Sequence, residues 1–512
     1  MTITSFSFLV LLGLGMILYY ILPKSWQWVE LLLISITFYC FATVPTTIIY
    51  LILSVVTAYV STNIIEYFEN KPHGSIILRI STIAAISFNV GLWFILKAQG
   101  IWLPILYRLG GTDFLNISMA VGALGMGYYT LQIIGYILDC YWKTIKPQKN
   151  IAKLFLFTAF FPQLITGPIS RYEQLESLFE KHSFSYENIT KGAQRILWGF
   201  LKKLVLAERV GIIVNHIWSN LPEYPGVFRW IAFLLYPLQM YADFSGCMDI
   251  VIGAAQIFDI HLSENFNNPF FARTVQEFWR RWHITLGTWA KDYVLYPLLK
   301  CKSMVKLGKL TKKRLGKKLG KFIPTAIGMF ALWMVMGIWH GGFNYIIGVS
   351  LWYWAILMLG EWFEPLAKKI TQSMNINVNS FSWHLFQSVR TYLIYAVGAT
   401  FFRAEELKEA IAFLASLGQL FTSSAFNPWV LFNGSIVNTG VSFADINLII
   451  FSTGLLIVVG ILREKYGYAR EWMQVQILPF RWFVWMGLFI IVLIYGMYGP
   501  GYSAVEFIYQ GF

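Results

Sequence analysis

Charged residues are scarce in this chain of 512 residues, because Asp, Glu, Lys and Arg make up only 13% of it. Soluble domains carry about 25% charged residues, so the composition excludes an ordinary soluble domain. The chain is instead 57% hydrophobic, with apolar runs near the roughly 20 residues that a helix needs to cross a bilayer. The sequence therefore predicts an all-α polytopic integral membrane protein.

Motifs of metal sites and of serine hydrolases are also lacking. The four cysteines show no CxxC spacing, and neither an HExxH nor a G-x-S-x-G motif occurs. These absences argue against a zinc site, a disulfide framework and a nucleophile elbow. We therefore expect no bound metal or cofactor.

Twelve apolar spans indicate about 11–12 transmembrane helices in a single domain, residues 1–512. The first span has no basic residue before it and Lys24 directly after it, which predicts an uncleaved span with the N-terminus outside. The spans lie near 6–22, 28–44, 48–65, 76–96, 119–138, 195–216, 228–257, 322–340, 343–360, 385–402, 446–462 and 482–498.

The net charge of +14 does not indicate nucleic-acid binding, because ten Lys and Arg residues, with no acidic residue, cluster in the segment 300–321 between membrane spans. Such a cluster is typical of a cytoplasmic topology anchor at anionic lipid headgroups. A dock for an acidic acyl carrier protein is the alternative. The segment 421–447 contains no Lys or Arg and is predicted to be an outside loop.

The middle third of the chain differs from the plain apolar helices before it. Pro, Gly and polar residues interrupt "AFFPQLITGPISRYEQL", "QMYADFSGCMDIVIGAAQIF" and "ENFNNPFF". Irregular backbone at membrane depth occurs only inside protein or beside a watery cavity. Asp243, Ser245 and Asp249 are therefore expected to face a cavity or the bundle interior, although a helix–helix hydrogen bond also explains Ser245.

His340 ends an apolar span in "MVMGIWHGGFN". Trp333, Met336, Gly337 and His340 follow the spacing of one helical face. Glycine one turn before the imidazole and two glycines after it leave room for a ligand or another backbone. Helix packing is the structural alternative, but an ionisable group within the membrane favours a functional role.

His283 lies in "EFWRRWHITLGTWAKDYVLYPL", which we interpret as one amphipathic helix at the membrane interface, with its tryptophans at headgroup level. An interfacial anchor is equally compatible with this spacing. The apolar face comprises Trp282, Leu286, Trp289 and Tyr293, and the polar side Arg280, Arg281, Lys291 and Asp292.

A buried histidine without a nucleophilic side chain suits acyl transfer from a thioester to a hydroxyl. The donor is already activated, so the protein has to align the reactants, remove the hydroxyl proton and stabilise the oxyanion. A neutral imidazole is suited to the proton transfer.

Five blocks carry a resemblance to a known family: "FWRRWHITLGTWAKDYVLYPL", "YADFSGCMDIVIGAAQIF", "ENFNNPF", "FFPQLITGPISRY" and "WHGG". They resemble the signature blocks of the membrane-bound O-acyltransferases (MBOAT). The order of the blocks, with "GMGYYTLQIIGYILDCYW", "GATFFRAEEL" and the C-terminal "YSAVEFIYQGF", is similar to the bacterial branch that contains the membrane subunit of alginate O-acetyltransferase. The block after His283 departs from the family's frequent "YIPLGG".

The resemblance implies an MBOAT fold, a ring of helices around a central tunnel, with a catalytic core over 110–402. It implies that His340 is the catalytic histidine and that His283 has a positioning or proton-relay role. Donor would enter from the cytoplasm and acceptor from outside. The residues expected to contact substrates are Trp339, Arg280, Arg281, Trp282, Asp243, Ser245 and Asp292.

The expected function is transfer of an acyl group, most simply acetyl, from acetyl-CoA or an acyl carrier to hydroxyls of an extracytoplasmic polysaccharide or cell-wall polymer. Transfer would be direct or through an SGNH-type extracytoplasmic partner, in a bacterial cytoplasmic membrane. D-alanyl transfer from a carrier protein to teichoic acid is one alternative. A proton-coupled polysaccharide or lipid transporter is another, against which the lack of an evident internal repeat counts.

Overall fold

The structure is a computed structural model, and it describes residues 1–72, 74–97, 102, 124–224, 226–418, 429 and 433–499. The first residues of the span predicted at 119–138, part of the loop predicted outside between 421 and 447 (421–428 and 430–432), and the C-terminal block from residue 502 lie outside these ranges. Within them the fold is helical, without strands, and one isolated β-bridge pairs Phe266 with Trp282. The all-α prediction is confirmed.

The N-terminal half contains α1 (Phe6–Ile21), α2 (Gln27–Ala42), α3 (Ile48–Phe68), α4 (Gly74–Lys97), α6 (Met126–Tyr141), α7 (Ile151–Ala159), α8 (Tyr186–Phe200), α9 (Glu208–Ser219) and α10 (Val227–Ile257). The second half contains α11 (Val275–Arg281), α12 (Ile284–Ala290), α13 (Tyr296–Lys300), α14 (Lys302–His340), α15 (Phe343–Tyr345), α16 (Trp352–Ser373), α17 (Phe381–Arg403), α18 (Leu407–Leu417), α19 (Phe443–Tyr466), α20 (Ala469–Gln474) and α21 (Leu478–Tyr495).

Seven helical segments of the described chain are long and apolar enough to cross a membrane. They agree with seven of the predicted spans, and α1 is a shorter apolar helix at the first one. The chain is therefore a polytopic membrane protein. The predicted spans at 195–216, 228–257 and 385–402 fall on α8–α9, α10 and α17, which are helices but are not among these seven.

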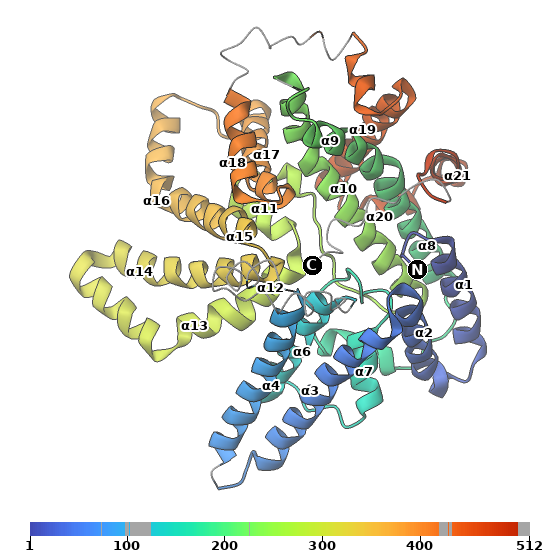
Figure 1. The fold of residues 1–512 in the computed structure, drawn as a ribbon, viewed down its shortest axis with the longest axis vertical. Helices are drawn as coiled ribbons and strands as arrows, with labels where there is room; N and C mark the ends of the chain where they lie inside the picture. The colour runs from blue at the N-terminus through green and yellow to red at the C-terminus, as the bar shows by residue number, and fades with distance from the viewer. Residues whose placement is uncertain are drawn as a thin grey trace, which may run out of the picture.

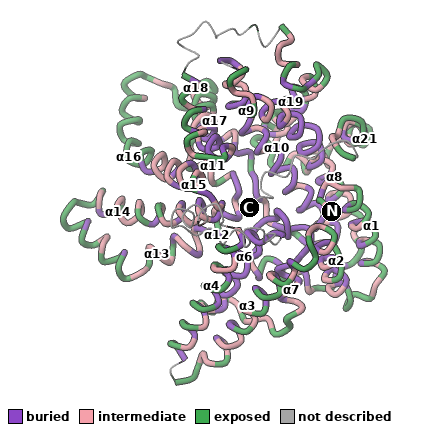
Figure 2. Tube along the Cα trace, in the orientation of Figure 1, coloured by how far each residue is buried: buried purple, intermediate pink, exposed green. Residues whose placement is uncertain are grey.

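Helices α6, α10 and α12 gather near the centre of the view, while α13–α14, α16 and α3–α4 project outward (Figure 1). Burial follows this arrangement, because the central segments are largely buried and the projecting ends are exposed (Figure 2). Only 17% of the apolar window of α19 and 11% of that of α21 are buried in the protein. Apolar side chains on these helices therefore face the bilayer.

Glycines allow α8 and α10 to cross at very close range. A Cβ atom at Gly199 would lie 2.6 Å from the carbonyl oxygen of Gly246, and one at Gly192 would lie 2.6 Å from that of Gly253. Any side chain at these positions would push the two helices apart. The same crossing carries two buried ion pairs, Lys202 with Asp249 at 2.6 Å and Lys203 with Asp243 at 2.7 Å.

The prediction of one continuous helix around His283 is wrong. Helix α11 ends at Arg281, and His283 adopts a left-handed conformation with φ 46° before α12 begins. The amide of Asn267 donates to the carbonyl of Arg281 at 2.9 Å, and the amide of Ile284 donates to that of Asn265 at 3.0 Å. Pairing with the 265–267 segment thus replaces helical hydrogen bonds at the break.

Candidate active site

His340 is the last residue of α14, and its position follows from how that helix ends. Gly341 has φ 93°, a conformation that glycine adopts without strain, and its amide donates to the carbonyl of Ile338 at 2.9 Å. His340, Trp333 and Met336 are all buried. The predicted face of α14 is therefore confirmed as an inward face.

The glycine before His340 serves helix packing. A Cβ atom at Gly337 would lie 1.9 Å from Oγ of Ser350, which donates to the carbonyl of Trp333 at 2.7 Å. Ser350 belongs to the segment Ile346–Leu351, which continues into α16. Close contact between this segment and α14 thus fixes the end of α14 that carries His340.

His283 is held by a side chain from the polar stretch before α11. Its Nδ1 lies 3.2 Å from Oδ1 of Asn265. The same amide oxygen accepts from the backbone N–H of Thr285 at 3.1 Å and from its hydroxyl at 3.0 Å. An oxygen acceptor at this position favours the imidazole tautomer with the proton on Nδ1, which leaves Nε2 as the basic nitrogen.

The two histidines line one cavity of about 30 Å³, which we call the histidine cavity. Its walls come from α10, α11, α12, α14, α16 and α17, so distant parts of the chain meet there. A single water needs about 10–15 Å³ of such space, so the cavity holds about two waters and has no room for a thioester donor. Its lining includes His283, His340, Trp279, Trp282, Tyr353, Tyr395 and Phe402.

Trp339 contacts both histidines. Its ring centroid lies 4.8 Å from that of His340 and 6.3 Å from that of His283. The indole N–H donates to the carbonyl of Gly127 at 3.0 Å, which fixes the ring against α6. Trp339 is thus a buried wall between the two imidazoles.

Trp282 also belongs to this site and is buried inside the protein. It is 2% exposed, stacks on Phe278 and contacts Tyr395. Trp282 and the buried Trp289 thus pack against protein and not against lipid headgroups, while the depth of this stretch in the membrane stays a prediction. The reason is the backbone break beside His283, which turns Trp282 into the protein.

The structure does not bring Asp243 and Ser245 to the histidine cavity. Asp243 forms its buried ion pair with Lys203, and Oγ of Ser245 accepts from Nζ of Lys202 at 2.9 Å. Ser245 lines a second cavity, the α19–α21 cavity, which lies between α8, α10, α19 and α21. Its lining includes Arg195, Lys202, Asp249, Glu264, Arg463 and Arg470.

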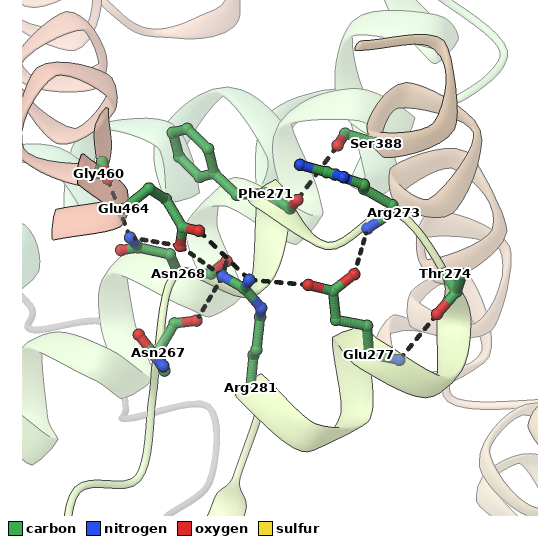
Figure 3. Close-up of polar contacts among 10 residues, drawn as sticks. All are labelled: Asn267, Asn268, Phe271, Arg273, Thr274, Glu277, Arg281, Ser388, Gly460 and Glu464. Carbon is green, nitrogen blue, oxygen red and sulfur yellow. Dashed lines mark hydrogen bonds and ion pairs between the residues drawn. The ribbon is translucent and has the colours of Figure 1, made fainter. Parts of the chain in front are cut away.

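Arg281 is engaged by two carboxylates in the structure. Its guanidinium donates to Glu277 at 2.8 Å and pairs with Glu464 of α19, while Glu464 also accepts from Nδ2 of Asn268 at 3.1 Å (Figure 3). This network ties α11 to α19. Arg281 is therefore already neutralised where it stands.

Arg280 and Asp292, the other two predicted contacts, also lie away from the histidine cavity. Arg280 is exposed, so its charge is accessible. Asp292 forms an ion pair with Arg171, which precedes the segment Glu173–Phe179. Of the seven predicted substrate contacts, two lie at this site: Trp282 lines the histidine cavity, and Trp339 contacts both histidines.

Asn265 and the aromatic side chains of α16 and α17 were not singled out by sequence reasoning. Asn265 lies in the quoted "ENFNNPFF" stretch, but spacing gives no reason to pair it with His283. Phe402, whose ring lies 5.1 Å from that of His340, belongs to the quoted "GATFFRAEEL". Among the residues that the structure describes, no group of three His, Cys, Asp or Glu side chains is placed to hold a metal ion.

Comparison with known proteins shows a similarity to one family. Residues 143–313 match the sequence model of MBOAT, the membrane-bound O-acyltransferase family. This match includes His283 and ends before His340.

Several curated bacterial proteins are similar to this chain. "Probable alginate O-acetylase AlgI" of Pseudomonas putida is 30% identical over 334 residues, which are 62% of this chain and 63% of that protein. "Peptidoglycan O-acetyltransferase" of Helicobacter pylori is 26% identical, over 77% of this chain and 73% of that protein. "Teichoic acid D-alanyltransferase" of Bacillus subtilis is 28% identical, over 49% of this chain and 61% of that protein.

The chain spans 50–63% of the length of three Pseudomonas alginate relatives that it matches. Their similarity agrees with the quoted blocks and with the polytopic helical fold. The chain is therefore similar to the membrane-bound O-acyltransferases, both in the segment 143–313 and along the parts shared with these relatives.

Proposed function

We propose that this protein is an O-acyltransferase that moves an acetyl group from a thioester donor to hydroxyls of an extracytoplasmic polysaccharide. The observation that carries the proposal is the pair of buried histidines, His283 and His340, which reach one cavity from separate helices. The names of the alginate and peptidoglycan relatives support acetyl transfer to a polymer.

The proposed reaction needs one proton acceptor at the hydroxyl. The imidazole of His340 takes the hydroxyl proton while the hydroxyl oxygen attacks the thioester carbonyl carbon. The carbon–sulfur bond then breaks, an ester forms, and the departing thiolate takes the proton. General base catalysis of this kind contributes about 10²–10⁴-fold to the rate.

His283 is proposed as the positioning partner. Its Nδ1 faces Asn265, and Trp339 lies against both imidazoles. This arrangement supports a fixed ring that holds substrate or relays a proton. Because the histidine cavity has room for only about two waters, the aromatic side chains around it have to move apart when substrates bind.

The proposed orientation puts the basic segment 300–321 in the cytoplasm. Nζ of Lys143 pairs with Glu69 at 2.6 Å, so the loops after α3 and α6 lie on one side. The two candidate spans Lys24–Ala42 and Pro45–Phe68 cross the membrane in succession, so that the loop after α1, with Lys24, lies on that same side. The Arg171–Asp292 ion pair connects the start of the basic segment with that side. The positive-inside rule assigns such a side to the cytoplasm, with the N-terminus outside.

Exposed lysines of α13 and α14 are proposed to attract an anionic donor, either acetyl-CoA or an acyl carrier protein. Their charge would raise the rate of encounter with an acidic partner. On the opposite side, an SGNH-type protein is the proposed partner that passes the acyl group to the polymer. The protein would act in the bacterial cytoplasmic membrane.

D-alanyl transfer is the second candidate function, and the similarity to the B. subtilis teichoic acid D-alanyltransferase favours it. One experiment tests both candidates. Cells that lack the native gene are complemented with the wild type or with His340→Ala, at matched membrane levels, and ester-linked groups are released from the surface polymer by mild base. Acetate supports the first function and D-alanine the second, whereas wild-type ester levels in the mutant would contradict the assigned role of His340.

A further inference from the structure

The α19–α21 cavity has a volume of about 460 Å³ and lies apart from the histidine cavity. Volumes of roughly 300–1,000 Å³ are typical of ligand sites. Apolar side chains from four helices form most of its walls: Trp198 and Met248 from the core, and Val459, Val484, Trp485 and Leu488 from α19 and α21. A hydrocarbon chain fits such walls.

The position of the cavity gives a hydrocarbon chain a route from the bilayer. Helices α19 and α21 are candidate membrane spans with most of their surface outside the protein core. The cavity lies where α19 ends and α21 begins, next to the connecting helix α20. Tyr468 and Trp472, which line it there, are the residue types that mark headgroup depth.

Charged side chains line one end of the cavity. Four are basic and two are acidic, so this end carries an excess of two positive charges (four minus two). Two of the basic groups are fully engaged. Arg195 donates twice to Glu264, at 2.7 and 2.6 Å, and once to Asp249 at 2.8 Å, while Lys202 pairs with Asp249 at 2.6 Å.

Arg463 and Arg470 carry the excess charge. Within the described residues Arg463 makes no ion pair, and its one ring contact is with Tyr468 at 4.8 Å. Arg470 lies 4.0 Å from Glu264, which Arg195 already holds. Glu464 lies next to Arg463 in the chain and interacts with its charge, but its carboxylate forms its ion pair with Arg281 (Figure 3). Two arginines beside an apolar cavity at the membrane edge are a site for a phosphate group.

We propose that the α19–α21 cavity binds an anionic phospholipid of the bilayer. Its phosphate would pair with Arg463 and Arg470, and one acyl chain would extend between α8, α10, α19 and α21. The net negative charge of an anionic lipid complements the excess of two positive charges. A zwitterionic headgroup has no net charge and does not complement it.

The lipid site shares a wall with the candidate active site. Asn265 lines the α19–α21 cavity, while its amide oxygen contacts His283 and Thr285. Its Nδ2 donates to the sulfur of Met248 at 3.2 Å, and Met248 lines the same cavity. Bound lipid would therefore stabilise the 264–268 segment that holds His283.

The test is a titration of the purified, delipidated full chain in neutral detergent with phosphatidylglycerol, phosphatidylcholine or acetyl-CoA, followed by thermal unfolding. We expect phosphatidylglycerol to raise the melting temperature and the other two to leave it unchanged. In Arg463→Gln/Arg470→Gln the affinity for phosphatidylglycerol should fall by at least about tenfold.

Two matched controls separate the site from general charge and from misfolding. Lys465→Gln/Arg481→Gln removes two positive charges beside the cavity without touching its lining, and it should bind phosphatidylglycerol like the wild type. Val484→Trp fills the apolar end and should lose binding, whereas Phe483→Trp, at a position that is 78% exposed, should keep it.

Equal binding of phosphatidylcholine, or equal weakening by both double variants, would overturn the proposal. Displacement of phosphatidylglycerol by acetyl-CoA would assign the cavity to the donor instead. Because binding is measured without acyl transfer, the outcome is independent of the proposed function.

Discussion

The Nδ1 atom of His283 lies 3.2 Å from the side-chain oxygen of Asn265, and this contact is made across a break in the backbone. The same oxygen also accepts two hydrogen bonds from Thr285. Asn265 thus fixes both the ring of His283 and the start of α12. It is a positioning residue, and it lies on the wall between the two cavities.

Asn265→Ala should lower the turnover number by about 10- to 100-fold while changing the KM for donor little, because a shift of about 1 Å in a positioned group costs that much. Asn267→Ala is the matched control, since Asn267 contacts Arg281 through its backbone. Kinetics of both variants in membranes, with a thioester donor, measure the difference. Equal turnover in the two variants would mean that Asn265 does not position His283.

His340→Ala should reduce ester formation by about 10²–10⁴-fold and leave a folded, membrane-inserted protein. The physical reason is loss of the only proposed proton acceptor at the hydroxyl. His261→Ala is the control, because that side chain is 66% exposed and does not line the histidine cavity. Ester formation that persists in His340→Ala would leave the histidine with a structural role alone.

Arg280→Ala and Arg281→Ala should behave differently although the residues are adjacent. Arg281 joins α11 to α19 through Glu464, so its loss should lower the free energy of unfolding by about 1–3 kcal/mol and reduce the melting temperature. Arg280 is exposed, and its loss should raise the KM for an anionic donor without changing stability. A pair of variants with the same melting temperature would contradict the structural role of Arg281.

Gly199→Ala should destabilise the protein by about 1–3 kcal/mol, because the added methyl group meets the backbone of α10 at 2.6 Å. Gly454→Ala in α19 is the matched control, since no atom lies within 4 Å of its added Cβ. Thermal unfolding in detergent compares the two. If the control lost as much stability as Gly199→Ala, the close crossing of α8 and α10 would not be the cause.

Replacing Lys312, Lys313 and Arg314 by Glu should weaken donor engagement or upset the membrane orientation, because it reverses charge in the basic segment. Accessibility of engineered cysteines on the two sides reports orientation, and competition by an acidic carrier protein reports docking. Lys368→Glu/Lys369→Glu in the exposed part of α16 is the control. If both the orientation and the activity were unchanged, the basic segment 300–321 would be neither a topology anchor nor a donor dock.

Much of the architecture was predictable because its signals are local in the sequence. Composition and long apolar runs determine a polytopic helical membrane protein, since hydrocarbon requires each segment to satisfy its own backbone hydrogen bonds. The face that carries Trp333, Met336 and His340 follows from helical periodicity alone, and all three are buried. Such a pattern can be read from the sequence because helical geometry places residues three or four positions apart on the same face.

The site required contacts between segments that are distant in the chain. The break beside His283 arises from backbone pairing with the 265–267 segment. The hydrophobic periodicity of the sequence does not predict this pairing. Asp243 and Ser245 pair with Lys203 and Lys202, away from the histidines, because α8 and α10 cross at glycines. The sequence by itself determined the membrane class, the helices and the inward face of His340. The tertiary structure alone decided which polar groups meet, because the partner of a buried charge is set by packing and not by spacing along the chain.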